Sequence, residues 1–322
     1  MRYIVFIPLI ISTIISYAQV SEVLLPYGDM NQWQVRYIRE SGILGGERKM
    51  LYAIAPTDTI YHNQAYVPCT GNPWGSSSTY AKCIVETAAD GAVSPEKRGD
   101  GYCCRLENKL KHVELCDIYA MVTGTIFFGE NLEPVGLAAK NKPYTAIDFG
   151  FPFNQHPMAL KLDYKAKVED SNVIISTRRN KIEFEEGRDM VGLLLLFQYR
   201  WEDPETGNIY AYRVGTASMR VSNDVPEWIN NHIVPIRWGK TALSTTANED
   251  TILAPQEHLN SSYMMTRNSK GKMVMIEEVG YSTIAPTHAV LMISSSWAGA
   301  FRAHEGNIFW VDNLRWVYDH SQ

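Results

Sequence analysis

Hydrophobic positions in this chain come in short runs rich in β-branched and aromatic residues, and Gly, Pro, Asn or Asp separates one run from the next. Runs of this kind predict strands rather than helices. The predicted strands are Val113–Ile118, Met121–Phe128, Ala159–Val168, Val173–Thr177, Gly192–Trp201, Ile209–Val221, Met273–Val279, Ala289–Ile293 and Ile308–Tyr318. Many short strands at this spacing predict an all-β fold, a jelly-roll β-sandwich.

The patterns inside the runs predict how the strands are covered. The segment Leu160–Val168 alternates apolar and polar residues, so one of its faces is expected to be wet. The segment Val191–Phe197 does not alternate, which predicts a central strand covered on both sides. The best helix candidate is Val225–His232, because Asp224 can cap it and Pro226 fits its first turn.

The first residues have the pattern of an export signal. Arg2 precedes an apolar run from Ile4 to Ile15, and Ser16-Tyr17-Ala18 follows as a small-x-small cleavage site. A cleavable signal peptide over 1–18 is therefore predicted, with Gln19 as the new N-terminus. The run is too short for a membrane anchor, no later run reaches the roughly 18 apolar residues of a membrane helix, and no cysteine follows for lipid attachment. A periplasmic or secreted location is expected.

Residues 19–322 are expected to form a single large β-sandwich domain, since all-β domains of this length often fold as one unit. A soft boundary is possible near residues 65–79, where Pro68, Gly71, Pro73 and Gly75 cluster. The alternative of a small N-terminal lobe stays open.

Charge and composition narrow the range of partners. The formal net charge is −5, and the basic residues are scattered rather than gathered in a stripe, which argues against nucleic acid. The chain has 18 Tyr, 10 Phe and 8 Trp, most of which should be core, while some in loops could stack on sugar rings.

The chain contains five cysteines. If the residues around Cys83 and those around Cys103-Cys104 form a hairpin, Cys83 could pair with Cys103 or Cys104 in a disulfide. The alternative is that these cysteines are buried thiols that pack as small apolar groups.

Several segments resemble, in their shared order, the carbohydrate metabolism domain (PCMD) family of exported Bacteroidetes proteins, a jelly-roll domain often encoded among polysaccharide-utilisation genes. These segments are Gly28–Trp33, Arg98–Leu106, Thr123–Gly129, Asp148–Pro157, Leu162–Lys165, Ile293–Gly299 and Gly306–Leu314. The resemblance implies a sandwich like those of galactose-binding and carbohydrate-binding modules, and a role in glycan handling. It does not separate binding from catalysis.

The loop Gly150–Pro157 combines aromatic rings with amides and an imidazole, a mixture that suits sugar recognition. Rim tryptophans where strands give way to loops could add stacking surfaces. The predicted ligand contacts are Phe153, Asn154, His156, Trp201 and Trp297. The favoured function is non-catalytic recognition of an oligosaccharide or polysaccharide in a glycan-utilisation system.

Two alternatives to binding remain, a glycoside hydrolase with a β-sandwich fold and a structural or adhesin-like protein. Hydrolysis needs two carboxylates across a cleft, and the candidates are Glu183 with Glu185 and Glu277 with Glu278. No longer catalytic signature accompanies either pair, so no catalytic residue is assigned.

First and last strands lie side by side in jelly rolls, so residues near the two ends of the domain could converge. Their oxygen-bearing side chains would suit a structural Ca²⁺ ion. The predicted ligands are Asp29, Asn31, Asp312 and Asn313. The alternative is that they are ordinary turn and edge residues, and no other cofactor is expected.

Overall fold

The computed structural model describes residues 20–82, 85–113, 118–136, 139, 143–177, 181–243 and 264–319, so the predicted signal peptide lies outside the described residues. Strands dominate, and the described helical segments are short 3₁₀ turns at Gly42–Leu44, Pro143–Ala146 and Gly239–Leu243. Among these described segments no helix has the length and apolar character to span a membrane.

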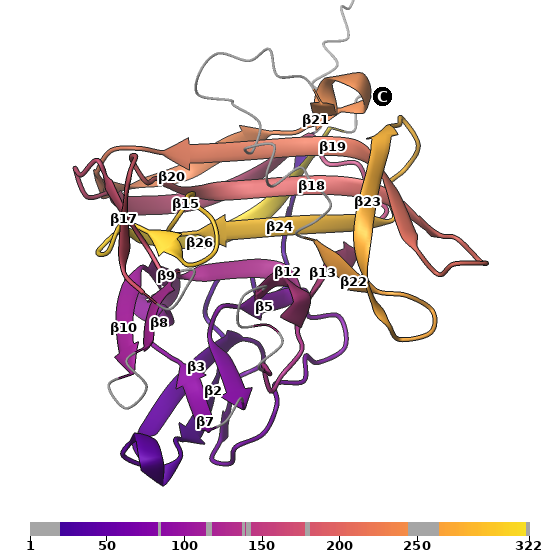
Figure 1. The fold of residues 1–322 in the computed structure, drawn as a ribbon. Helices are drawn as coiled ribbons and strands as arrows, with labels where there is room; N and C mark the ends of the chain where they lie inside the picture. The colour runs from indigo at the N-terminus through magenta and orange to yellow at the C-terminus, as the bar shows by residue number, and fades with distance from the viewer. Residues whose placement is uncertain are drawn as a thin grey trace, which may run out of the picture.

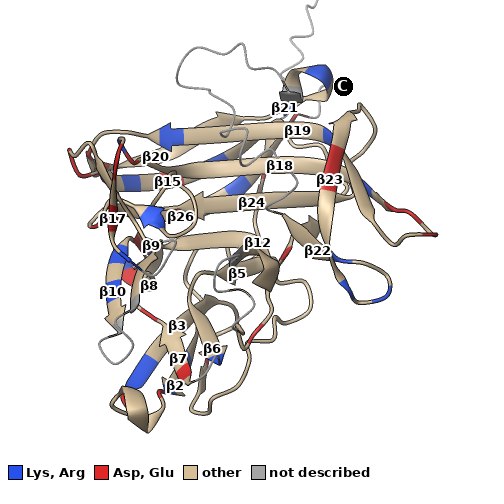
Figure 2. Ribbon diagram, viewed as in Figure 1, with Lys and Arg blue, Asp and Glu red and all other residues tan. Residues whose placement is uncertain are grey.

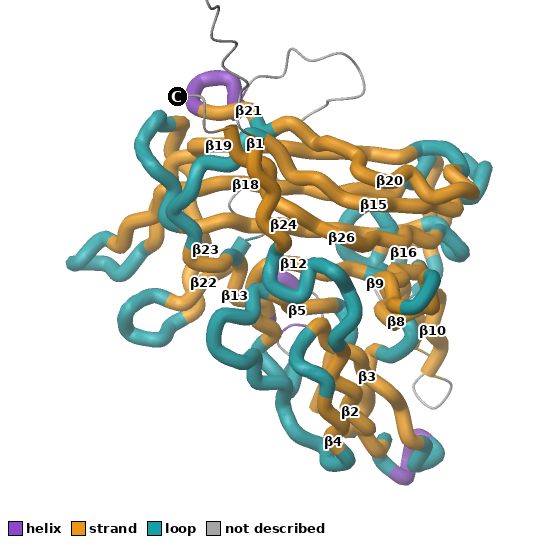
Figure 3. The backbone as a smooth tube through the Cα atoms, turned by 180° about the vertical axis from the view of Figure 1, so that it is seen from behind, coloured by secondary structure: helices purple, strands orange, loops and turns teal. Residues whose placement is uncertain are grey.

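One face of the sandwich is a six-stranded sheet in the order β20-β15-β26-β9-β8, with β1 paired to β26 beside this path (Figure 3). Its pairings are antiparallel. The strands are β1 (Val20–Leu24), β8 (Val93–Arg98), β9 (Gly101–Glu107), β15 (Ala159–Lys167), β20 (Val225–Pro235) and β26 (Ile308–Asp319). The first strand therefore lies beside the last one, as the jelly-roll prediction required.

The second sheet has ten strands, with the main order β13-β12-β24-β18-β19-β23-β22 (Figure 1). These strands are β12 (Thr125–Asn131), β13 (Ile147–Phe149), β18 (Val191–Glu202), β19 (Ile209–Val221), β22 (Met265–Arg267), β23 (Met273–Tyr281) and β24 (His288–Ser294). Three short strands join its sides: β5 (Trp74–Ser76), β14 (Phe151–Pro152) and β21 (Arg237–Trp238). Two large sheets packed on each other confirm the all-β sandwich.

The two faces of β18 show why this sheet is stable. Leu193, Leu195 and Phe197 point into the main core between the two large sheets. Leu194 and Leu196 point into a second core on the opposite face, which β13, β22 and β23 help to cover. All five side chains are buried, as the non-alternating run predicted.

Five strands between residues 33 and 89 form a lobe that projects from the sandwich, and β5, between them in sequence, belongs to the large sheet instead (Figure 1). The lobe contains the sheet β3-β2-β4 and the hairpin β6-β7. The strands are β2 (Trp33–Arg39), β3 (Arg48–Ile54), β4 (Asp58–Ile60), β6 (Thr79–Lys82) and β7 (Glu86–Ala89). Arg36 on β2 makes a buried ion pair with Glu133, which follows β12, so this contact ties the lobe to the sandwich.

Two further small assemblies lie at the end of the sandwich away from β22. One is the hairpin of β10 (Lys109–Val113) and β11 (Ile118–Val122). The other is the sheet β17-β16-β25, built from β16 (Val173–Ser176), β17 (Glu183–Glu186) and β25 (Arg302–Ala303). Figure 2 shows that basic and acidic residues are dispersed over the whole fold.

The predicted helix Val225–His232 is wrong, because these residues form most of strand β20. Pairing with β15 satisfies the backbone along one edge and overrides the local helix signal. The carboxylate of Asp224, expected to cap the helix, instead accepts a hydrogen bond from the backbone of Val168 at 2.6 Å.

Two predicted strands have wrong boundaries. Of the predicted strand Val113–Ile118 only the two end residues are described, the last of β10 and the first of β11, and residues 114–117 lie outside the described residues. Met121–Phe128 is divided between β11 and β12. The other seven predicted strands correspond to β15, β16, β18, β19, β23, β24 and β26.

The predicted disulfide is also wrong. Cys103 and Cys104 are free and buried, while Cys83 lies outside the described residues. The expected hairpin does not form, because β9 pairs with β8 and β26, whereas β6 pairs with β7. Burial raises the pKa of the Cys103 thiol to about 12, so this group behaves as a neutral packing residue.

Candidate functional site

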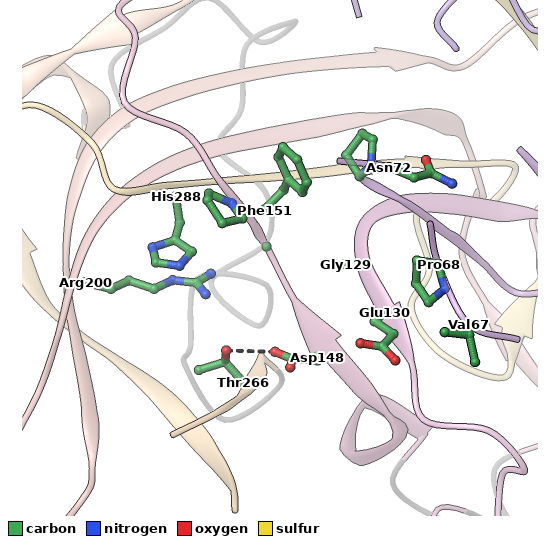
Figure 4. Close-up of a pocket in the computed structure, with 13 residues that line it drawn as sticks. Val67, Pro68, Asn72, Gly129, Glu130, Asp148, Phe151, Arg200, Thr266 and His288 are labelled. Atoms are coloured by element: carbon green, nitrogen blue, oxygen red, sulfur yellow. Dashed lines mark hydrogen bonds between the residues drawn. The ribbon is translucent and has the colours of Figure 1, made fainter. Parts of the chain in front are cut away.

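A pocket of about 390 Å³ opens where β13 and β22, the two ends of the main path of the ten-stranded sheet, approach each other (Figure 4). Its volume is at the small end of the range of about 300–1,000 Å³ that is usual for ligand pockets. Seven stretches of chain contribute to its wall, which consists of Val67, Pro68, Asn72, Pro73, Gly129, Glu130, Asp148, Gly150, Phe151, Pro152, Arg200, Thr266 and His288.

Arg200 is the most deeply placed charge in this wall, with 9% of the residue exposed. It lies on β18, on the face that carries Leu194 and Leu196. Its Nε donates to Gln198 Oε1 at 2.8 Å, and its Nη1 donates to the backbone oxygen of Phe149 at 2.8 Å. Its Nη2 is buried and has no hydrogen-bond partner among the described residues. Burial lowers the pKa of the guanidinium to about 10, while the charges of Asp148 and Glu278 oppose that shift.

A buried polar network holds Arg200 from behind. Gln198, which accepts from Arg200, donates through Nε2 to Glu278 Oε1 at 2.6 Å. Glu278 also accepts from Nε and Nη2 of Arg213, a residue with no measurable exposure. Because each member is fixed by the next, the Arg200 side chain is held in one orientation toward the pocket.

His288 stands beside Arg200 at the start of β24 (Figure 4). Its Nδ1 is 2.9 Å from the hydroxyl of Thr287. Burial and the positive charge of Arg200 lower the pKa of this imidazole to about 3. The ring is therefore neutral near pH 7 and offers hydrogen bonds without charge.

Two carboxylates occupy another part of the wall. Glu130 on β12 and Asp148 on β13 are directly opposite each other in the antiparallel pairing. Asp148 accepts from the Thr266 hydroxyl at 2.8 Å and from the Arg267 backbone at 3.2 Å. The Arg267 guanidinium is 3.7 Å from Glu130 and 3.8 Å from Asp148, and it partly neutralises both.

The strand-to-loop segment from Gly150 to Pro152 borders the pocket next to Arg200. Gly150 has a φ of +101°, and a Cβ atom there would be 2.6 Å from Nη2 and 3.0 Å from Nη1 of Arg200. Only glycine leaves this end of the guanidinium uncovered by a side chain. Phe151 adds a half-buried aromatic ring to the same wall.

None of the three predicted contacts in loop 150–157 lines this pocket, although Gly150, Phe151 and Pro152 of the same loop do. Phe153 does not line it and packs on Phe197 and Trp316, with ring centroids 5.4 and 5.2 Å apart. Asn154 and His156 are exposed, and the His156 ring stacks on Trp238 at 3.6 Å.

The two predicted tryptophans lie far apart. Trp201 belongs to a half-exposed group with Tyr199, Tyr210 and Tyr212, which form two cross-strand pairs on β18 and β19. Trp297 follows β24, near the opposite end of β18, where Ser294 pairs with Gly192. Along β18 the separation is about 30 Å at roughly 3.3 Å per residue. One small ligand therefore cannot contact both.

The carboxylates considered for catalysis also fall in different places. Glu183 and Glu185 are on β17, away from the pocket, and Glu185 forms an ion pair with Arg302. Glu277 and Glu278 point to opposite sides of β23, so they do not form a pair across a cleft. Glu277 is exposed, whereas Glu278 binds Arg213.

The residues considered for calcium fall into two hydrogen-bonded groups. Asn31 donates to Asp29 at 3.3 Å and accepts from the Tyr102 backbone at 2.8 Å. Asp312 has Arg98 as its partner at 2.6 Å, and the side chain of Asn313 donates to Asp163 at 2.8 Å. A cation at Asp312 would have to displace the Arg98 guanidinium. The described part of the chain contains no group of three or more His, Cys, Asp or Glu that could hold a metal.

No family model matches the chain and no curated protein is similar to it, so the PCMD resemblance stays a prediction. Solved structures similar to the chain include two proteins described as putative glycoside hydrolases. The one from Bacteroides thetaiotaomicron is 16% identical, with 89% of this chain and 71% of that chain covered and a TM-score of 0.46. The one from Bacteroides vulgatus is 15% identical, with 92% and 94% covered and a TM-score of 0.44. Similarity at this level carries no argument about activity.

Proposed function

We propose that this chain binds an oligosaccharide or the end of a polysaccharide in the pocket beside Arg200, without cleaving it, as an exported part of a glycan-utilisation system. The observation that carries the proposal is the composition of the pocket wall. A guanidinium, a neutral imidazole, an amide, two carboxylates and a phenyl ring surround one small space between rigid strands.

This combination fits the chemistry of a sugar. Each hydroxyl donates one hydrogen bond and accepts others, so it needs donors and acceptors at short range. Arg200 supplies donors, Asp148 and Glu130 supply acceptors, and His288 can do either. The amide of Asn72 already donates to Ile54 and Tyr66, so it offers an acceptor only. The C–H face of a pyranose is apolar and suits the ring of Phe151.

The ligand contacts predicted from the sequence stay in the proposal as places where a longer glycan could continue beyond the pocket. Asn154 and His156 follow Pro152 along the loop, so a longer glycan could reach them from the pocket. The group around Trp201 offers three tyrosine rings beside an indole and could take further sugar units. Trp297 would belong to a separate surface.

A glycan array followed by calorimetry tests the proposal. We expect wild-type protein to bind at least one oligosaccharide while releasing no reducing ends. Replacing Asp148 by Asn should weaken that binding by about 1–2 kcal/mol, because a charged acceptor for hydroxyls is lost. Glu186→Gln, on an exposed strand of the β16–β17 hairpin, serves as the matched control and should leave binding unchanged. Absence of binding to every glycan would overturn the proposal.

One observation favours hydrolysis as a second candidate. Glu130 and Asp148 are direct cross-strand neighbours, and such pairs have Cβ atoms about 4.5–5.5 Å apart. Retaining glycosidases hold their two carboxylates about 5 Å apart. Release of reducing ends that is abolished in both Glu130→Gln and Asp148→Asn, but not in Glu186→Gln, would replace binding by hydrolysis as the function.

A further inference from the structure

Three arginines are buried among the described residues, and their partners differ. Arg36 forms two hydrogen bonds to the carboxylate of Glu133, and Arg213 forms two to the carboxylate of Glu278. Arg200 has only the neutral oxygens of Gln198 and Phe149, and no carboxylate of the described residues makes an ion pair with it. Asp148 and Glu278 act on its charge only from beyond ion-pair distance. A buried charge with no carboxylate in direct contact is costly, so proteins seldom retain one without a reason.

We infer that the glycan bound in the pocket is acidic, and that the carboxylate of a uronic acid unit is the counter-ion of Arg200. This inference rests on the proposed function and specifies the substrate class of the same site. Its basis is the contrast between Arg200 and the two paired arginines, together with the unpartnered Nη2 atom.

The donors that remain on Arg200 match a carboxylate. A guanidinium has five N–H donors, and in Arg200 the contacts to Gln198 and Phe149 use two of them. Those left on Nη1 and Nη2 can form a two-pronged contact with a planar carboxylate once the Gly150 segment, which lies against the buried Nη2, shifts on binding. Gly150 borders this edge, where any larger residue would place its Cβ against Nη2.

The other lining residues favour one orientation of the bound ligand. Asp148 and Glu130 would repel a second acidic group but accept hydrogen bonds from hydroxyls. His288 is neutral, so Arg200 is the single positive side chain among the lining residues. The acidic group is therefore expected beside Arg200 and Gly150, with the hydroxyls toward the two carboxylates.

Matched glycans test the inference on the unmodified protein. Oligosaccharides from polygalacturonate, alginate and a glucuronate-containing polysaccharide would be compared by calorimetry with the same oligosaccharides after chemical reduction of their carboxyl groups. We expect at least one acidic oligosaccharide to bind about tenfold or more tightly than its reduced form. A sulfated neutral oligosaccharide and its desulfated form would show whether sulfate can replace the carboxylate.

Variants then place the effect at Arg200. Arg200→Met should remove the preference for the acidic form. Arg200→Lys should keep only part of it, because lysine lacks the planar guanidinium that can form two parallel hydrogen bonds with a carboxylate. Arg188→Met, an exposed arginine near the other end of β18, should leave the preference intact. If Arg200→Met does not fold, the glycan comparison on wild-type protein and Arg200→Lys still decides.

The results of the glycan comparison distinguish failure of the inference from failure of the proposed function. Equal binding of acidic and reduced forms would overturn the inference while leaving the proposed function in place. Stronger binding of the sulfated form than of any uronic acid would also overturn it. Failure of every glycan to bind would overturn both the inference and the proposed function.

Discussion

The N-terminal lobe and the pocket wall use a buried arginine in opposite ways. In the lobe, Arg36 is 1% exposed and its guanidinium is matched to Glu133, whose carboxylate also accepts from the backbones of Tyr66 and Tyr80 at 2.8 and 3.0 Å. In the pocket wall, Arg200 is nearly as buried but faces neutral oxygens and an unmatched edge. Each arginine leaves one buried nitrogen without a partner, Nε of Arg36 and Nη2 of Arg200, so the difference lies in the direct carboxylate contact. An arginine in contact with a buried carboxylate holds two parts of the fold together, whereas one without that contact is suited to a ligand.

The largest expected effect comes from breaking the buried ion pair of Arg36 and Glu133. Glu133→Gln should lower the free energy of unfolding by about 3–5 kcal/mol, because it leaves Arg36 buried without a counter-charge. Urea unfolding followed by tryptophan fluorescence measures the change. Glu47→Gln removes a carboxylate that is 69% exposed in its pair with Lys49, so it should change the free energy of unfolding far less. If the two variants lost the same free energy of unfolding, burial of the ion pair would not be what makes Glu133 important.

A somewhat smaller effect is expected from the network behind the pocket. Glu278→Gln removes the counter-charge of Arg213 and one anchor of Gln198, so unfolding should become easier by about 3 kcal/mol. Because Gln198 holds Arg200, glycan binding should weaken as well. A variant that lost stability but kept full affinity would show that the network does not position Arg200.

Acid should lower the free energy of unfolding because His288 is buried as a neutral ring. Its pKa is about 3 in the folded protein against an ordinary 6.5, so the unfolded chain takes up the proton first. Stability attributable to this group is therefore present above pH 6.5 and is lost as the pH falls from 6.5 toward 3. Between pH 6.5 and 5, the free energy of unfolding of His288→Gln should fall by about 2 kcal/mol less than that of wild type. Parallel curves would contradict the burial of a neutral imidazole.

Much of the sandwich could be predicted because its strands have local signals. The uninterrupted run in β18 indicated a doubly covered strand, and seven strands were placed by β-branched and aromatic runs between turn residues. Strand β20 was missed because Asp224 and Pro226 have the sequence pattern of a helix cap and first turn. Its state is decided by pairing with β15, which is remote in sequence.

The pocket was harder to predict, because residues from Val67 to His288 meet there only through long-range pairing. Rules that look for aromatic loops selected Phe153, which packs in the core. A signal was nevertheless present in β18, where Gln198 and Arg200 continue the face of Leu194 and Leu196. Polar residues on a face that is otherwise buried indicate either a network or a site, and here they form both.

The most direct test of this comparison is the stability of Arg200→Met measured without any glycan, where we expect the smallest change. If Arg200 is retained for a ligand, removing its unmatched charge offsets the two lost hydrogen bonds to Gln198 and Phe149. The free energy of unfolding, measured in urea, should then stay within about 1 kcal/mol of wild type. A loss of about 3 kcal/mol or more, similar to that expected for Glu133→Gln, would show that Arg200 stabilises the fold as Arg36 does and would contradict the account.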